Sequence, residues 1–296
     1  MKTIKNLAFK GGGVLGIAYA GAIKVLEDNK ILDTVEKVSG TSAGAITAAL
    51  LSLRYNASEI YTIVQSTNFA DFEDNKKDLR VFTKYGIYAG ATLLQFIQKQ
   101  ITNKGLPATA TFKDFHDKGM RDLYVFATDL NTQGLQEFSY SKTPNTIVAE
   151  AIRASMSIPL FFGAWTFSNG IPNKHIYVDG GMIYNFPISI FDTGSQPNPE
   201  TMGLFLSNIS GPQPVNNLGY DHLFEYTKIL FETMMNAQVI NFLNNDEQKA
   251  RTANIDNLGI SATNFNLTDA QKQQLFDSGV KYTKAFVQQK LLVAAN

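Results

Sequence analysis

Residues 35–51 read VEKVSGTSAGAITAALL: a short apolar stretch, then a glycine-flanked serine, then a run of small apolar residues. This order predicts a strand, a tight turn and a helix, with Ser42 at the apex of the turn. A Gly-x-Ser-x-Gly turn strains its serine, and Gly40 and Gly44 leave the space around the turn empty. The hydroxyl then points into an open site at a helix N-terminus, where backbone N–H groups favour negative charge. Chance is the alternative explanation for so short a motif, but the strand-to-helix context favours a serine nucleophile for acyl transfer.

The composition of the 296-residue chain limits the class of protein. With 44% hydrophobic residues it can bury a sizeable core, and we expect one domain over residues 1–296. The formal net charge of zero argues against nucleic-acid binding, which needs clustered Lys and Arg, and against attraction to anionic lipid by bulk charge alone. The lack of cysteine excludes disulfides, thiolate zinc sites and a cysteine nucleophile.

No stretch of the sequence reads as a targeting or membrane-spanning segment. Residues 1–10 lack the apolar region of a secretory signal, and no apolar run is long enough to cross a bilayer. We therefore expect a cytoplasmic protein or one that contacts a membrane peripherally.

Two strand–turn–helix units open the chain. The first is a strand at Ile4–Phe9 with a helix at Gly16–Asn29, and the second is a strand at Val35–Ser39 with a helix at Ala43–Arg54. Such units are typical of a parallel sheet covered by helices. Residues 57–118 combine helical patterns with polar loops and aromatic residues, which we interpret as a helical insertion over the sheet and a candidate lid.

The rest of the chain continues the α/β pattern up to about residue 206. We predict strands at Asp122–Asp129, Gln136–Ser139, His175–Val178 and Met202–Leu206, helices at Thr146–Ser155, within Asp221–Ala250 and after Thr268, and loops at 196–199 and 211–217. The C-terminal part, residues 219–296, is predicted to be helical packing without a chemical motif.

The glycine loop Gly11–Gly16 (GGGVLG) follows the first predicted strand. It satisfies the Gly-x-Gly-x-x-Gly dinucleotide fingerprint, and a nicotinamide-dependent oxidoreductase is therefore one hypothesis. That fingerprint requires an acidic residue at the end of the second strand, whereas Glu36 lies near its start. The alternative is an oxyanion hole, in which the N–H groups of Gly11, Gly12 and Gly13 converge with that of Ala43. Parallel neighbouring strands would bring this loop and the Ser42 turn to the same sheet edge.

A serine nucleophile needs a base, and the three histidines are weak candidates for it. His116 lies in a polar segment, His222 begins the C-terminal helical region, and His175 stands about 13 Å along its strand from Asp179. Asp179 ends an apolar strand and precedes two glycines that allow another loop to approach. Burial would raise its pKa toward the value that a base needs. The alternative is an Asp-Gly turn that closes a hairpin.

The three blocks Gly11–Gly16, Gly40–Gly44 and Asp179–Gly181, in this order, resemble the patatin-like phospholipase family. Residues 127–132 (ATDLNT) and 153–159 (RASMSIP) add to the resemblance, which spans about residues 5–190. One departure is Leu15, where the family often carries Lys or Arg, and this leaves open whether a positive charge acts there.

The resemblance implies a three-layer α/β fold with a central, mostly parallel sheet flanked by helices. It also implies a lipid acyl hydrolase with a Ser42–Asp179 dyad, an acyl-enzyme intermediate and an oxyanion hole at Gly11, Gly12 and Gly13, and no need of a metal or other cofactor. The expected partners are a phospholipid or other acyl-ester lipid, a membrane surface contacted peripherally and, as a further option, a protein activator. The alternatives are an α/β-hydrolase with a Ser-His-Asp triad, the oxidoreductase and a non-catalytic binding module.

Overall fold

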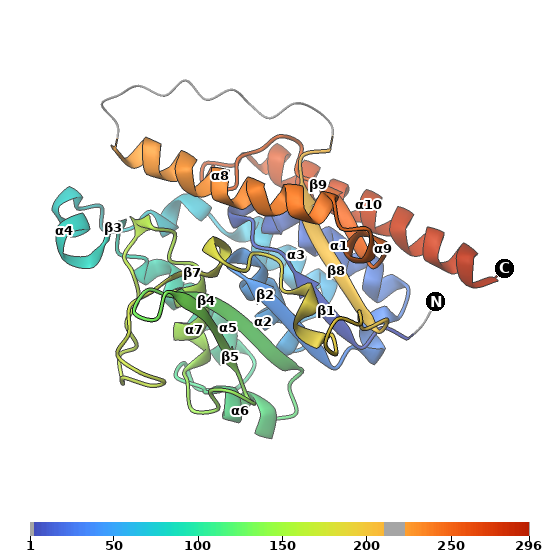
Figure 1. The fold of residues 1–296 in the computed structure, drawn as a ribbon, viewed down its shortest axis with the longest axis horizontal. Coiled ribbons are helices and arrows are strands. Elements are labelled where there is room, and N and C mark those ends of the chain that lie inside the picture. The colour runs from blue at the N-terminus through green and yellow to red at the C-terminus, as the bar shows by residue number, and fades with distance from the viewer. Residues whose placement is uncertain (1–2, 210–222, 296) are drawn as a thin grey trace.

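The centre of the structure, a computed structural model that describes residues 3–209 and 223–295, is a mostly parallel sheet. Its strands run in the order β5-β4-β2-β1-β8-β9, and β7 pairs with part of β4 (Figure 1). β1, β2, β4, β8 and β9 are parallel, whereas β5 and β7 are antiparallel to β4. The strand bounds are Asn6–Phe9 (β1), Lys37–Thr41 (β2), Asp122–Asp129 (β4), Gly134–Ser139 (β5), Tyr177–Asp179 (β7), Thr201–Ser207 (β8) and Thr252–Asp256 (β9); β3 (Gly86–Tyr88) and β6 (Leu160–Phe162) form a separate parallel pair.

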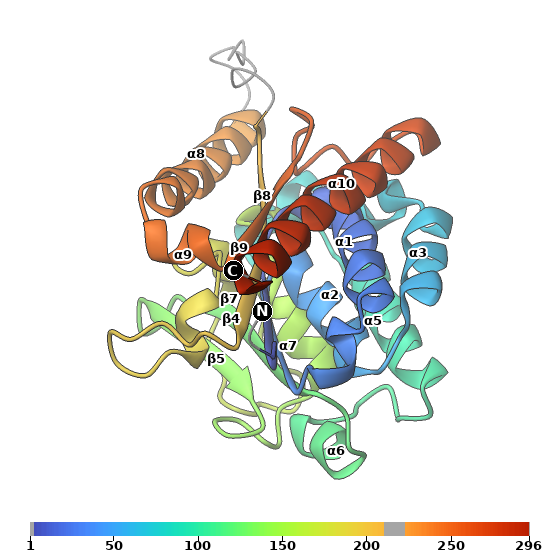
Figure 2. The ribbon, with the colours of Figure 1, turned by 90° about the vertical axis from the view of Figure 1, so that its right-hand side faces the viewer.

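Helices cover both faces of the sheet and make three layers (Figure 2). One layer holds α1 (Ile17–Asp28), α2 (Ala43–Ser52), α3 (Ala57–Ser66), α5 (Ala91–Asn103), α7 (Val148–Ser155) and α10 (Asp269–Ala295). The opposite layer holds α8 (Leu223–Leu243) and α9 (Asp246–Ala250), while α4 (Val81–Lys84) and α6 (Phe112–Asp117) are short peripheral helices. The predicted α/β fold with a mostly parallel sheet is confirmed.

The first and last long helices pack closely in the larger layer. A Cβ on Gly21 would lie 2.0 Å from the Phe276 carbonyl oxygen, and one on Gly279 would lie 1.9 Å from that of Ala18. The two glycines therefore let the backbones of α1 and α10 approach each other. The helix predicted after Thr268 begins with a capping box, in which Thr268 Oγ1 accepts from the Gln271 N–H at 3.2 Å and Gln271 Oε1 accepts from the Thr268 N–H at 3.0 Å.

The structure departs from the predictions at β9. Residues 252–256 fall in the C-terminal part that the sequence predicts to be helical, and two of the five, Asn254 and Asp256, are residues that sheets disfavour. Pairing with β8 decides the conformation, and Asn254 is satisfied by a hydrogen bond of 2.8 Å from Ser207 Oγ. Of the segment 57–118, α3 packs beside α1 and α5 beside α7; its role as a lid stays a prediction. The predicted loop 211–217 and His222 lie outside the described residues.

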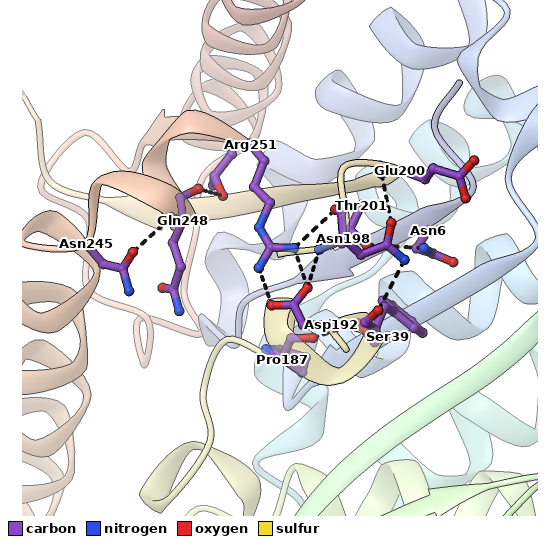
Figure 3. A network of polar contacts seen from close by, with 12 residues as sticks. Asn6, Ser39, Pro187, Asp192, Asn198, Glu200, Thr201, Asn245, Gln248 and Arg251 are labelled. Carbon is purple, nitrogen blue, oxygen red and sulfur yellow. Dashed lines mark hydrogen bonds and ion pairs between the residues drawn. The ribbon is translucent and has the colours of Figure 1, made fainter. Parts of the chain in front are cut away.

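A polar network joins the C-terminal third to the amino-terminal ends of β1 and β8 (Figure 3). Arg251 donates from its two Nη atoms to the two carboxylate oxygens of Asp192, at 2.6 and 2.5 Å. Asn6 donates to Thr201 at 3.2 Å and links the two strands. Ligands of open α/β sheets bind at the carboxyl ends of the strands, so this network at the opposite end is structural.

Candidate active site

The edge of β4 brings two distant segments together. β2 pairs with β4 as far as Thr41, opposite Phe126, and then turns into α2 at Ser42. β7 runs in the opposite direction along the rest of the same edge and ends at Asp179, opposite Ala127. β5 occupies the other edge of β4, so β2 and β7 must share this one. The two chain segments therefore meet end to end, which places residues 42 and 179 side by side.

The turn at Ser42 has the strained backbone that the sequence predicts. Ser42 has φ 53° and ψ −128° at the N-cap of α2, a conformation that L-residues seldom adopt. A Cβ on Gly40 would lie 2.1 Å from the Gly44 carbonyl oxygen, and one on Gly44 would lie 2.4 Å from that of Phe9. Both flanking glycines are therefore required by close packing of α2 against β1 and β2.

Ser42 and Asp179 are in direct contact. Ser42 Oγ donates a hydrogen bond of 2.7 Å to Asp179 Oδ2, and the Gly181 N–H donates one of 2.7 Å to Oδ1. Asp179 is fully buried and Ser42 is nearly so. Burial raises the pKa of Asp179 to about 7, although the hydrogen bonds from Ser42 and Gly181 lower it. A carboxylate with this pKa can exchange a proton with the serine near neutral pH.

Backbone N–H groups of the two turns beside the serine differ in whether they are already hydrogen-bonded. Within residues 3–209 and 223–295, the N–H groups of Gly12, Gly13 and Ala43 have no hydrogen-bond acceptor. The Gly11 N–H, which the sequence placed in the same set of donors, instead donates to the Asn185 carbonyl at 2.9 Å. The prediction for Gly11 is therefore corrected: its N–H is occupied, and the donors left open are those of Gly12, Gly13 and Ala43.

Ser155, Asn185 and Gln238 support the site but were not singled out from the sequence. Ser155 Oγ accepts from the Ser42 N–H at 2.8 Å and donates to the Phe126 carbonyl at 2.5 Å. Gln238 of α8 accepts from the Asn185 N–H at 2.8 Å and donates to the Gly181 carbonyl. Ser155 lies within the quoted block 153–159, whereas Gln238 stands in a helix without motif and carried no sequence signal.

Two cavities meet at Ser42, and both include Gly13 and Ile158. The first has a mixed lining and is called the polar cavity after its polar residues, which include Lys10, Ser207, Glu232, Asn236, Asn257, Ser261 and Thr263; Gly12 and the apolar Leu206, Phe231, Met235 and Val239 also line it. The second is mostly apolar; its other lining residues include Ile17, Ile46, Val64, Phe69, Phe72, Phe96, Met156, Phe162 and Phe265. The C-terminal third, expected to be packing alone, thus supplies α8 and the segment after β9 to the walls of the site.

The described histidines lie away from Ser42. His175 Nδ1 is 2.7 Å from Asp129 Oδ2, and His116 stacks on Tyr140 with a centroid distance of 3.8 Å. His222 lies outside the described residues. Neither of the two described histidines contacts Asp179 or Ser42, in keeping with the expectation that they pack or face solvent.

The described part of the chain offers neither a cluster of metal ligands nor a helix suited to a membrane. Residues 3–209 and 223–295 contain no group of three or more His, Cys, Asp or Glu side chains arranged to hold a metal ion. No helix within the same ranges combines the length and apolar character needed to span a bilayer.

Comparisons with known proteins identify a family, related sequences and a structure with the same fold. The sequence profile described as patatin-like phospholipase matches residues 7–192. Protein YqhO of Bacillus subtilis is 30% identical over 297 residues, which cover 95% of this chain and 97% of that protein. A protein of Invertebrate iridescent virus 6, named probable lipid hydrolase 463L, is 27% identical over 64% of this chain and 63% of its own length. The crystal structure of VipD from Legionella pneumophila has the same fold, with a TM-score of 0.65 at 15% identity over 97% of this chain and 67% of that one.

Proposed function

The chain belongs to the patatin-like phospholipase family and is a serine acyl hydrolase, and on this basis we propose that it cleaves acyl-ester lipids with Ser42 as nucleophile and Asp179 as general base. The observation that carries the proposal is the 2.7 Å hydrogen bond from the Ser42 hydroxyl to a fully buried carboxylate whose pKa is raised to about 7. Neither His116 nor His175, the two described histidines, takes part in that contact.

The proposed reaction has two steps. As Ser42 Oγ attacks the ester carbonyl carbon, Asp179 accepts the hydroxyl proton and a tetrahedral oxyanion forms. The C–O bond to the alcohol then breaks, Asp179 returns the proton to the leaving alcohol, and an acyl-serine remains. In the second step Asp179 accepts a proton from water, which attacks the acyl carbon, and the tetrahedral intermediate releases a fatty acid and restores the Ser42 hydroxyl.

The oxyanion is proposed to bind the open N–H groups of Gly12, Gly13 and Ala43. All three belong to or adjoin the two turns at the carboxyl ends of β1 and β2, and the N-terminus of α2 adds a favourable dipole. Each such donor contributes roughly 3–4 kcal/mol to the transition state of acyl transfer. Gly11 is left out because its N–H is already bound to Asn185.

A substitution at Gly13 tests this assignment. Gly13 has φ +55°, and a Cβ there would lie 1.9 Å from the Ala262 carbonyl oxygen, so Gly13→Ala displaces the loop. We expect kcat to fall about 10²-fold. Gly105→Ala is the matched control, because Gly105 has φ +76° but open space around it, and it should cost about 1 kcal/mol of stability without loss of activity. Equal activity of the two variants would contradict the proposed oxyanion hole.

The alternatives receive less support from the geometry. In a Ser-His-Asp triad a histidine would bridge the serine and the acid, yet Ser42 donates directly to Asp179. A dinucleotide on the glycine loop would have to occupy the space beside the Ser42 hydroxyl, and the second strand ends in the serine turn without an acidic residue. A binding module without activity would have no use for a buried, strained Ser–Asp pair.

The partners follow from the substrate. A lipid ester is presented in a membrane or micelle, so we propose peripheral contact with a lipid surface. A protein activator stays a prediction. The formal net charge of zero argues against nucleic acid as a partner.

The decisive experiment compares the wild-type protein with Ser42→Ala. The wild type should hydrolyse a lysophospholipid and a short soluble ester, should be labelled covalently by a fluorophosphonate, and should keep its rate in a chelator. Ser42→Ala should lose the labelling and at least about 10⁴-fold of the activity. Full hydrolysis by the alanine variant would refute the proposed nucleophile.

A further inference from the structure

The polar cavity beside Ser42 contains a buried cation for which the described residues offer no counter-ion. Lys10 follows β1 directly, is 6% exposed and lines this cavity. Its Nζ donates to the Gly11 carbonyl at 3.1 Å and lies 5.0 Å from the centre of the Phe205 ring. Among the side chains that the structure describes, none of the ion pairs within 4 Å involves Lys10. Desolvation lowers the pKa of Lys10 to about 8, which still leaves it mostly protonated at pH 7.

The acidic side chain in the same cavity is engaged elsewhere. Glu232 of α8 accepts hydrogen bonds from Ser261 Oγ at 2.8 Å and Thr263 Oγ1 at 2.6 Å. A buried ammonium without an anion carries a desolvation cost that a bound anion would offset. An anionic ligand group in the polar cavity would therefore stabilise the Lys10 ammonium.

The two cavities indicate how an ester bound at Ser42 would be oriented. Because both reach Ser42, an ester carbonyl at Ser42 can place its acyl chain in the apolar cavity and its alcohol part in the polar one. Resting on the proposed function, we propose that the Lys10 ammonium binds the phosphate of a phospholipid headgroup on the alcohol side of the scissile ester. Lys10 is then a specificity residue for phosphate-bearing substrates.

The test compares two substrates with the same acyl chain, a lysophospholipid and a monoacylglycerol, which differ in the phosphate. Lys10→Met should lower the ratio of kcat/KM for the lysophospholipid to that for the monoacylglycerol about 10- to 100-fold, mainly through KM. Lys24→Met, which removes an exposed charge on α1, is the matched control and should leave the ratio unchanged. Inorganic phosphate should inhibit the wild type more than Lys10→Met if the subsite accepts phosphate alone, and equally if it needs the whole headgroup.

An unchanged substrate ratio in Lys10→Met would overturn the phosphate subsite. A loss shared equally by both substrates would show a structural role for Lys10, and the melting temperature reports this independently. The proposed function fails separately, through a fully active Ser42→Ala. The two failures are therefore distinguishable.

A second, independent feature is an exposed apolar tip at residues 76–85, which projects from one end of the molecule around α4 (Figure 1). Leu79 is 78% exposed, Phe82 80% and Tyr85 52%. The same ten residues contain four basic side chains and one acidic one. Large apolar groups beside cations are typical of surfaces that enter the headgroup region of an anionic membrane.

The tip is connected to the site. β3 follows it directly and pairs with β6, where Tyr88 lies opposite Phe162, a residue of the apolar cavity at Ser42. We propose that residues 76–85 dock on a bilayer that contains anionic lipid, so that the acyl chain enters beside β3 and β6.

Vesicle co-sedimentation tests this surface in a Ser42→Ala background, so that it does not depend on hydrolysis. Binding to phosphatidylcholine vesicles with phosphatidylglycerol should exceed binding to pure phosphatidylcholine and should weaken in high salt. Leu79→Ser with Phe82→Ser should weaken binding about 10-fold or more. Leu292→Ser, which changes a residue 69% exposed near the far end of α10, is the matched control. Equal binding of the double variant and the control would refute the proposed docking surface.

Discussion

The short antiparallel ladder between β4 and β7 has an aspartate near each end, Asp179 opposite Ala127 and Asp129 opposite Tyr177. Asp179 is fully buried, receives a serine hydroxyl and has a pKa raised to about 7. Burial also opposes ionisation of Asp129, but hydrogen bonds from His175 and from backbone N–H groups hold its pKa below the ordinary value. We therefore expect the aspartate paired with a histidine to take no part in catalysis, so that environment rather than residue type distinguishes the proposed base.

The largest expected effect separates the two acids directly. Asp179→Asn keeps the shape of the site but removes the proposed base, so kcat/KM should fall about 10³- to 10⁴-fold. Asp129→Asn should keep activity within a few-fold of the wild type. The measurement is the hydrolysis rate of each variant on one soluble ester. Comparable activity in both variants would contradict the different roles proposed for Asp179 and Asp129.

The pH dependence of hydrolysis also distinguishes Asp179 from Asp129. With Asp179 ionised only above about pH 7, kcat/KM should rise about tenfold per pH unit up to that value and then level off. His175→Ala should leave the midpoint where it is. A midpoint that moved in His175→Ala would connect the histidine to the proton transfer.

Stability should respond to the two acids with opposite sign. The folded pKa of Asp179 exceeds its unfolded value, so stability falls as pH rises from about 4 to about 7, by at most about 4 kcal/mol. The folded pKa of Asp129 is lowered, so its contribution is present at neutral pH and lost in acid. At pH 8, Asp179→Asn should therefore raise the melting temperature, and Asp129→Asn should lower it. Melting curves that move in the same direction at pH 8 would contradict this.

The smallest effect concerns His175 itself. His175→Ala removes the contact with Asp129 at the rim of the ladder, and the histidine side chain is 35% exposed. We expect activity close to that of the wild type and a loss of about 1 kcal/mol of unfolding free energy. A large loss of kcat would restore the Ser-His-Asp alternative.

The sequence alone predicted those parts of the site that depend on local conformation. Glycines at positions 40 and 44 predict the turn at Ser42 because a side chain there would collide with backbone within a few residues of the chain or in the next strand. The strand that ends at Asp179 and the strand at 122–129 were predicted in the same way, from short apolar stretches bounded by turns.

The remaining features depended on residues far apart in the chain. No local pattern predicts that β7 and β2 meet end to end along β4. Nor does one predict that the Asn185 carbonyl accepts from the Gly11 N–H, or that α8 and the segment after β9 line the polar cavity. The Asp129–His175 pair likewise formed across 46 positions. Local sequence determines turns and element type through backbone sterics and periodicity, whereas burial, partner choice and the resulting pKa values arise only when distant segments exclude water together.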